Sequence, residues 1–304
     1  MTQWRALLGG DFSASKGRMR AGAQLLLMAT NPLNRRILQT VLERPLEVSP
    51  GRLYKVSAGG RESLFVAFVA ERWLQGAPQG PIPFDSAEAE RAVAALAEGW
   101  SATVVHVLAR GPRGFDELRR ESEGLSRREL RHHISAMRKA GQIESRPGTD
   151  GRALYAITDW LLAGIAPLIA SARLERRQPK EGMAPIDALD VEAAFRLSLP
   201  LVRLPKELSG VCRLGLNLDE ERKASLTGVT ATIDQGQVVS CEAGLDKVAN
   251  AWAAGSACEW LDTVIEPDAR RVRTGGDRWL ARALLDGLHR SLFGIQVARD
   301  DRGA

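Results

Sequence analysis

The sequence predicts an α+β protein built from three domains, and three observations support this prediction. The chain has 304 residues, which is long for a single domain. Its middle is dominated by helical patterns, whereas its last third also contains alternating apolar residues typical of half-buried strands. Two segments rich in turn-forming residues, 76–83 and 178–185, separate these regions. We therefore expect domains at residues 1–83, 84–178 and 186–296.

The first domain contains a faint copy of a pattern that returns in the second. An Asn-Pro pair at residues 31–32 marks a helix start, and the apolar spacing of residues 38–45 recurs 67 positions later. Residues 61–75 occupy the place of a DNA-reading helix, but they are too apolar for that role. We interpret residues 20–80 as a degenerate copy kept for packing or dimerisation; a second DNA-contacting unit is the alternative.

Three helices are expected at the start of the second domain. Residues 85–98 begin with a sequence that resembles a capping box. Residues 100–110 form a short apolar helix that a Gly-Pro pair ends. Residues 115–121 form another short helix, and a tight turn at residues 123–125 follows it.

The most informative stretch is residues 124–141, GLSRRELRHHISAMRKAG. Ser126 and Glu129 form an S-x-x-E capping box that marks a helix start. Apolar residues at spacings of four and three lie on one face: Leu130, Ile134 and Met137. The opposite face is polar and mostly basic: Arg128, His132, Ser135 and Lys139, with Arg131 at its edge. Such a helix suits the major groove of DNA, although an ordinary amphipathic helix with a solvated basic face is the alternative.

A β-hairpin with a basic tip is expected directly after this helix. Residues 142–146 and 153–158 are strand-like, and the turn formers 147–151 lie between them. Arg146 and Arg152 flank the loop, where they reach a minor groove or the neighbouring phosphates. This order of elements, two helices, a turn, a basic helix and a basic hairpin, predicts a winged helix-turn-helix. Residues 1–178 are therefore expected to contain two such units in tandem, the first of them degenerate.

Residues 99–177 resemble the HxlR-type winged-helix transcription regulators, a branch close to the MarR group. The similar segments are GPRGFDELRRESEGLSRRELRHHISAMRKAGQIESR and, after the hairpin, LYAITDWLLAGIAPLIASARLERR. The resemblance implies a cytoplasmic, dimeric protein that binds operator DNA. The adjacent His132 and His133 depart from the family pattern and weaken any assignment of the target bases.

The predicted DNA contacts fall into two groups. We expect four residues to reach base edges: Arg128, Arg131, His132 and Ser135. We expect five to position the protein on phosphates: Arg127, Arg138, Lys139, Arg146 and Arg152. The helix expected at residues 159–177, which Pro167 kinks, packs within its own domain or, by family analogy, forms a subunit interface.

The third domain has the pattern of an α+β fold. Apolar alternation predicts strands at residues 213–218 and 226–233, and a turn at residues 234–236 leads into a third strand. Residues 249–265 read as a helix that Gly-Ser at 255–256 interrupts, and residues 279–293 form a strongly amphipathic helix.

Residues 190–294 resemble the sterol-carrier-protein lipid-binding fold. The similar segments are VTATIDQGQVVSCEAGLDKVANAWAAGSACEWL and GGDRWLARALLDGLHRSLF. That fold encloses an apolar tunnel, so the resemblance implies a domain that senses a small hydrophobic ligand. The candidate ligand-binding residues are Trp252, Trp260, Leu261, Leu284 and Leu288. The alternative is that these residues form an ordinary core.

Charge and cysteine content narrow the function classes. Lys and Arg outnumber Asp and Glu by 14 to 9 in residues 99–178, whereas residues 179–304 have 16 against 19. The basic excess therefore lies on the predicted DNA-binding part. Cys212, Cys241 and Cys258 have no metal-binding spacing, so we expect buried free thiols, with a redox sensor as the alternative.

We expect a cytoplasmic, homodimeric transcription regulator, whose effector shifts DNA affinity by linkage. No apolar run has the length of a membrane span, and the N-terminus lacks a signal-peptide pattern. We expect neither cofactor nor metal, because adjacent histidines cannot chelate one ion, and no enzyme, because no nucleophile and base are paired in the sequence. The rival hypothesis is a protein that sequesters an apolar compound and uses its winged helices as a scaffold.

Overall fold

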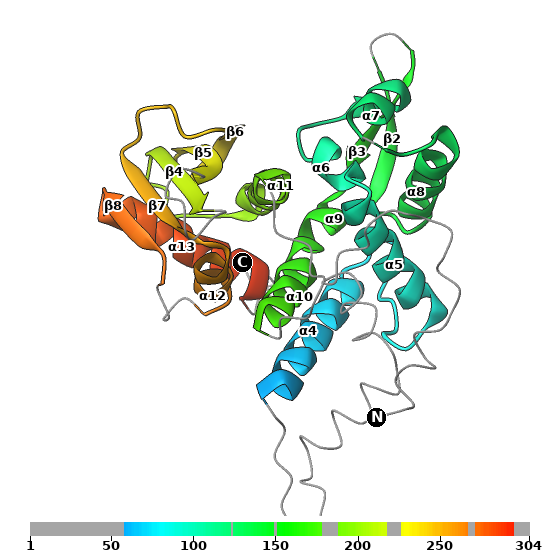
Figure 1. The fold of residues 1–304 in the computed structure, drawn as a ribbon, viewed down its shortest axis with the longest axis horizontal. Coiled ribbons are helices and arrows are strands. Elements are labelled where there is room, and N and C mark those ends of the chain that lie inside the picture. Colours follow the sequence, from blue (N-terminus) through cyan, green and yellow to red (C-terminus); the bar gives the residue numbers. More distant parts are fainter. Residues whose placement is uncertain are drawn as a thin grey trace, which may run out of the picture.

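The computed structural model describes residues 58–122, 124–148, 151–177, 188–217, 226–266 and 271–294. The described chain is an α+β fold with two sheets. Figure 1 shows two lobes, one around each sheet, with helices α4 (Ala58–Gln75) and α10 (Ile165–Arg177) side by side below them. The predictions for residues 1–57, including the helix that begins at Asn31, lie outside the described residues. Within the described ranges, no helix is long and apolar enough to cross a membrane.

The first lobe combines short helices with a small antiparallel sheet. Its elements are α5 (Ala87–Ser101), α6 (Val104–Leu108), β1 (Arg113–Gly114), α7 (Phe115–Glu121), α8 (Arg127–Lys139), β2 (Ile143–Pro147), β3 (Ala153–Ile157) and α9 (Asp159–Ala163). Strand β3 lies between β1 and β2. The short helix expected at residues 100–110 is confirmed as α6, but it starts only at residue 104, because Thr103 adopts a left-handed φ of 59° that separates α6 from the end of α5.

The second lobe is built on a sheet with strand order β6-β5-β4-β7-β8. Its elements are α11 (Ala188–Ser198), a 3₁₀ turn (Leu199–Leu201), β4 (Gly210–Asn217), β5 (Leu226–Asp234), β6 (Gln237–Ala243), β7 (Ala251–Ser256), α12 (Ala257–Ile265), β8 (Arg273–Gly276) and α13 (Arg278–Phe293). Neighbouring strands are antiparallel except β4 and β7, which are parallel. The buried side chains of Leu214, Val229 and Ala253 lie in register across three strands and form the centre of this lobe's core.

Several local expectations for the second lobe are confirmed. The strands near residues 213–218 and 226–233 are β4 and β5, and the turn into β6 has two residues with positive φ, Gln235 and Gly236. Helix α13 begins after Asp277, whose side chain accepts hydrogen bonds from the backbone N–H groups of residues 279 and 280 at 3.0 and 3.1 Å.

The helix expected at residues 249–265 is wrong in its first half. Residues 251–256 form strand β7, in which Ala251, Ala253 and Gly255 are buried and the residues between them are partly exposed. The small side chains suit a helix as well as a strand, so local composition favours the wrong element. The helix starts only at residue 257, where Ser256 and Glu259 form a capping box.

The helix expected at residues 159–177 is divided into α9 and α10 at Gly164. A Cβ at Gly164 would lie 3.0 Å from a methyl carbon of Leu96, so a side chain here would crowd α5. Pro167 lies in the first turn of α10, where its missing N–H breaks no hydrogen bond within the helix.

A reciprocal pair of tryptophans joins α4 to α9. The indole rings of Trp73 and Trp160 are stacked, with centroids 4.7 Å apart and planes 14° apart. Each indole N–H donates to the backbone carbonyl of the other tryptophan, at 2.8 and 2.9 Å. Both side chains are buried, so these bonds satisfy groups that water cannot reach. The pair bridges the predicted domain boundary at residue 83.

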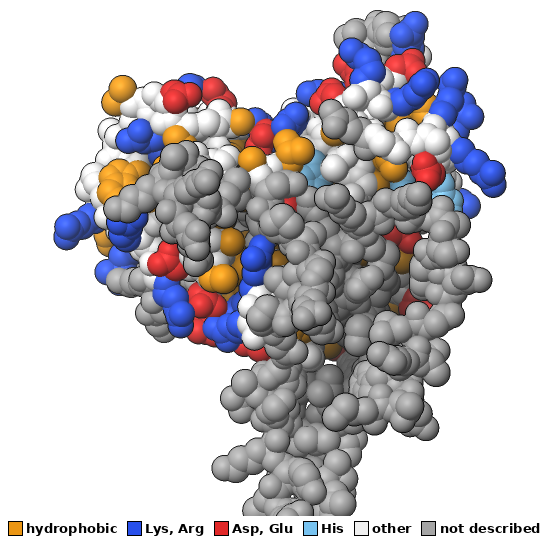
Figure 2. Space-filling model, viewed as in Figure 1, with side chains coloured by type: hydrophobic (Ala, Val, Ile, Leu, Met, Phe, Trp, Pro, Cys, Tyr) orange, Lys and Arg blue, Asp and Glu red, His pale blue; other side chains and the backbone are white. Residues whose placement is uncertain are grey.

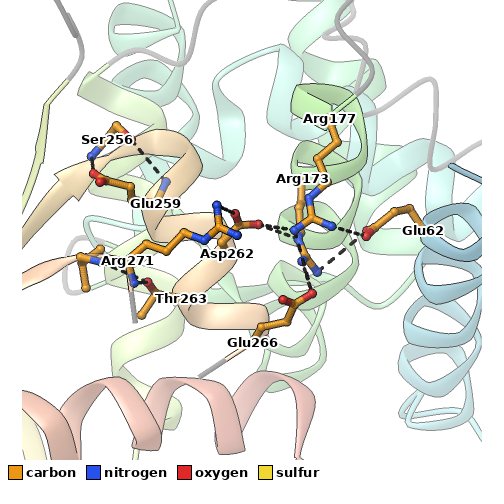
Figure 3. A network of polar contacts seen from close by, with 10 residues as sticks. Glu62, Arg173, Arg177, Ser256, Glu259, Asp262, Thr263, Glu266 and Arg271 are labelled. Carbon is orange, nitrogen blue, oxygen red and sulfur yellow. Dashed lines mark hydrogen bonds and ion pairs between the residues drawn. The ribbon is translucent and has the colours of Figure 1, made fainter. Parts of the chain in front are cut away.

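An ion network centred on the buried Arg173 joins α4, α10 and α12 (Figure 3). The Arg173 side chain is only 4% exposed; its Nε donates to the Asp262 carboxylate at 2.9 Å, and it also pairs with Glu266. Arg177 bridges the same carboxylate, at 2.8 Å, and Glu62 of α4, at 2.7 Å. The two lobes therefore meet at α10, and their buried apolar residues form one continuous cluster.

We predict that Trp73→Phe lowers the free energy of unfolding by about 2–3 kcal/mol, because the buried hydrogen bond from the Trp73 indole to the Trp160 carbonyl is lost and the ring stacking weakens. Urea denaturation measures this loss. Trp279→Phe is the matched control, since Trp279 is 63% exposed and its replacement should change stability by less than about 0.5 kcal/mol. Equal losses in the two variants would contradict the role given to the pair.

We predict that Asp262→Asn destabilises the fold by about 3 kcal/mol near neutral pH, because Arg173 loses a buried partner while Glu266 remains beside it. Burial alone would raise the pKa of Asp262, but hydrogen bonds from Arg177 and Arg173 outweigh it and hold the pKa below its ordinary value of 3.8. A lowered folded-state pKa gives stability that is present above the ordinary pKa and is lost as pH falls through the folded value. The difference between wild type and variant should therefore shrink below pH 3.8; a constant difference would contradict the assignment.

Candidate functional site

Helix α8 forms as its sequence predicts. Ser126 Oγ accepts from the Glu129 backbone N–H at 3.2 Å, and the Glu129 carboxylate accepts from the Ser126 N–H at 2.8 Å. The apolar residues Leu130, Ile134 and Met137 are buried. The capping box is confirmed, and the helix presents its other side to solvent.

Two contacts hold α8 closely against α5. A Cβ at Gly99 would lie 2.6 Å from Met137 Sδ, so the glycine allows the two helices to approach. The buried Gln142 side chain donates to the Ala92 carbonyl at 2.6 Å, just beyond the end of α8. Gly141 adopts a φ of 76°, which ends the helix in a left-handed conformation. The position of α8 is therefore fixed by packing on both sides of its last turn.

All nine residues predicted to contact DNA are exposed. Seven lie on α8 and two in the hairpin, one within β2 and one just before β3: Arg127, Arg128, Arg131, His132, Ser135, Arg138, Lys139, Arg146 and Arg152. Figure 2 shows Lys and Arg side chains along the edge of the molecule that carries α8 and the hairpin in Figure 1. We call these nine residues the basic face. The fold thus brings together residues separated by up to 25 positions.

The cations of the basic face differ in how they are held. The guanidinium carbons of Arg127 and Arg131 lie 5.7 and 5.6 Å from the centre of the Phe115 ring on α7. Arg146 pairs with Glu144 on the same strand at 2.6 Å. Among the described residues, Arg128, Arg138 and Lys139 have no ion-pair partner. Two arginines are thus preorganised, whereas three cations are available to an incoming anion.

The two adjacent histidines have different surroundings. His132 is exposed, whereas His133 is partly buried, with its Nδ1 3.8 Å from a carboxylate oxygen of Glu98. Burial disfavours the imidazolium and lowers the pKa of His133, and Glu98 offsets this only in part. His133 therefore belongs to the packing of α8 against α5. In the part of the chain that the structure describes, no group of His, Cys, Asp and Glu residues has the arrangement of a metal site.

An apolar cavity of about 170 Å³ lies between the two lobes. It is lined by α10, α11, α12, α13 and β4, and by Trp100 of α5. Of the candidate ligand-binding residues, Trp260, Leu261 and Leu288 line it. Trp252 and Leu284 do not: Trp252 packs on Gly275 of β8, and Leu284 is fully buried in the core. We call this space the joint cavity.

Helix α10 also lines the joint cavity, although none of its residues is among the ligand-binding candidates predicted from the sequence. Ile165, Leu168, Ile169 and Ala172 line the cavity. The sequence shows these residues as an apolar stripe. It predicts that the stripe packs within its own domain or forms a subunit interface. In the structure this stripe instead faces α11 and α12 of the same chain.

The cysteines do not form a common site. Cys212 is buried and Cys241 is half-buried, and burial raises the pKa of these thiols to about 12 and about 11. Both are therefore protonated and poorly reactive near neutral pH. Cys258 is exposed, so the expectation of three buried thiols is wrong for that residue.

Comparison with known proteins finds no match to this chain, whether among family models, curated proteins or solved structures. The features that bear on function are therefore the basic face and the joint cavity.

We predict that Ser126→Ala lowers the free energy of unfolding by about 1 kcal/mol, because the first turn of α8 loses its cap. Urea denaturation measures the change. Ser135→Ala on the same helix is the control: its hydroxyl is exposed, and alanine is a better helix former than serine. If Ser135→Ala were as destabilising as Ser126→Ala, the loss could not be assigned to the cap.

Proposed function

We propose that the protein is a transcription regulator that binds double-stranded DNA, with α8 in the major groove. The observation that carries this proposal is the basic face: seven polar or cationic side chains of one capped helix are exposed while its apolar side is buried. A short helix with long cations on its free side meets guanine edges and phosphates in that groove. Preorganised arginines favour binding because less side-chain entropy is lost.

The surroundings of α8 support a winged helix-turn-helix. Helix α7 and a short turn precede it, and the β2–β3 hairpin follows it. In such a unit the second helix enters the groove while the first crosses the backbone. Arg146 and Arg152 then lie where the hairpin meets phosphates or a minor groove. The degenerate first copy that completes the proposed tandem architecture falls mostly in residues 1–57, outside the described residues.

We further propose that the regulator is a homodimer. A two-fold dimer places two copies of α8 in half-sites about one helical turn of DNA apart, roughly 34 Å. Because α10 is packed against α4 and α12 within one chain, the dimer surface is sought elsewhere.

A second candidate function, favoured by the joint cavity, is sequestration of an apolar compound by a protein that does not read DNA. The sterol-carrier-like architecture proposed for the second lobe suits either a sensor or a carrier. The two functions differ in their response to salt. A DNA-binding protein loses affinity steeply as salt rises, with a slope of log K against log salt of about −4.5 for the five residues per protomer that are expected on phosphates, whereas a carrier shows no site-specific duplex binding at any salt concentration.

We predict that Arg131→Ala weakens binding to a duplex selected from genomic fragments by about 1–3 kcal/mol, because a bidentate contact to guanine is lost. Lys139→Ala should weaken binding to all sequences alike and make the salt slope shallower by about 1. Fluorescence anisotropy at several salt concentrations measures both effects. Arg282→Ala on α13, also an exposed arginine, is the control and should leave affinity unchanged; an unchanged affinity for Arg131→Ala would contradict the proposal.

A further inference from the structure

The joint cavity is lined by α10 and by residues of both lobes. Leu168, Ile169 and Ala172 come from α10, whereas Leu261, Val264 and Leu288 come from α12 and α13 of the second lobe. Trp100 and Trp260 also line the cavity. A molecule inside would therefore contact, at the same time, the helix that follows the hairpin and the helices that cover the large sheet.

The size and lining of the cavity limit what it can bind. Its volume of about 170 Å³ is close to that of an engineered apolar cavity of about 150 Å³ that stays dry and binds benzene. Most of the side chains that line it are aliphatic or aromatic. One aromatic ring or an aliphatic group of similar size therefore fits the apolar part.

The polar residues of the lining differ in whether they are already paired. One Asp190 carboxylate oxygen accepts from the Trp100 indole at 3.1 Å and lies 2.9 Å from His106 Nε2. The Ser198 hydroxyl donates to a backbone carbonyl within its own helix. Glu175 already has an interaction partner as well. Arg176 is different: it is half-buried and has no hydrogen-bond or ion-pair partner among the described residues. A partly desolvated cation beside apolar walls favours an anionic group on the ligand.

We propose that the joint cavity is the effector site of the protein, and that its ligand is a compact apolar molecule with one carboxylate, which Arg176 binds. The effect of this ligand on DNA binding rests on the proposed function, whereas its binding to the cavity does not.

The elements around the cavity connect a bound ligand to the lobe that carries the basic face. Helix α10 follows α9, which the tryptophan pair holds against α4. Asp190 of α11 lines the cavity and also contacts His106 in α6 of the first lobe. A ligand that changes the spacing of α10 and α11 therefore shifts the arrangement of the lobe that carries α8, and its DNA affinity changes by the difference in ligand affinity between the two arrangements.

The site is tested with the full-length protein and two probes that share an apolar body, 3-phenylpropionate and the neutral 3-phenylpropan-1-ol. Titration followed by calorimetry, without DNA, should show saturable binding of one molecule per chain, with the carboxylate bound at least tenfold more tightly than the alcohol. Arg176→Gln should abolish this preference while alcohol binding persists, and Arg176→Lys should keep most of it. The control Arg282→Gln replaces an arginine outside the cavity lining and should change neither affinity.

Absence of saturable probe binding, or an unchanged carboxylate preference in Arg176→Gln, would overturn the site. Ala172→Phe provides an independent check, because it fills the cavity from α10 and should weaken both probes at least tenfold in a protein whose circular dichroism is unchanged. Duplex binding is then measured with and without 3-phenylpropionate. Probe binding without any duplex binding refutes the proposed regulator but leaves the cavity assignment standing, whereas duplex binding without probe binding refutes only the cavity assignment.

Discussion

Burial of the Arg173 guanidinium is the constraint on which the joint between the two lobes depends. A charge taken out of water costs several kcal/mol unless partners surround it, and Arg173 is only 4% exposed. Its partners come from α12 and, through Glu62, from α4. These segments are far apart in the sequence, so the charge of Arg173 is balanced only when α4 and α12 are both in place beside α10. The tryptophan pair adds a second requirement at the other end of α4, where both indoles are satisfied only by each other's backbone.

This joint also explains how the basic face and the joint cavity belong to one molecule. Helix α8 is fixed to α5 by Met137 and by the Gln142 hydrogen bond. Trp100 at the end of α5 lines the cavity and donates to Asp190 of α11. The face proposed to read DNA and the space proposed to hold an effector are therefore connected through side chains that are packed or hydrogen-bonded at every step, which is the arrangement that linkage between two sites requires.

Local sequence patterns were sufficient for α8, the hairpin, strands β4 to β6 and α13, because each has a period and an end signal of its own, such as the Ser126–Glu129 box or Asp277. They were insufficient for β7. Its alanine-rich sequence is compatible with helix, and it becomes a strand because it pairs in parallel with β4, about 40 residues earlier. The same limit applies to the candidate sites. The exposure of the basic face follows from helical periodicity, whereas the α10 wall and Arg176 depend on which distant helix covers the stripe, which periodicity does not specify.

Photo-crosslinking shows whether duplex DNA lies against the exposed side of α8. A benzophenone amino acid is placed at Ser135 in one protein and at the exposed Trp279 of α13 in another, and each is irradiated with a duplex selected from genomic fragments. We expect crosslinks from position 135, confined to bases in one major-groove segment, and none from position 279. Crosslinks from position 279 without any from position 135, or no retained duplex at all, would contradict it.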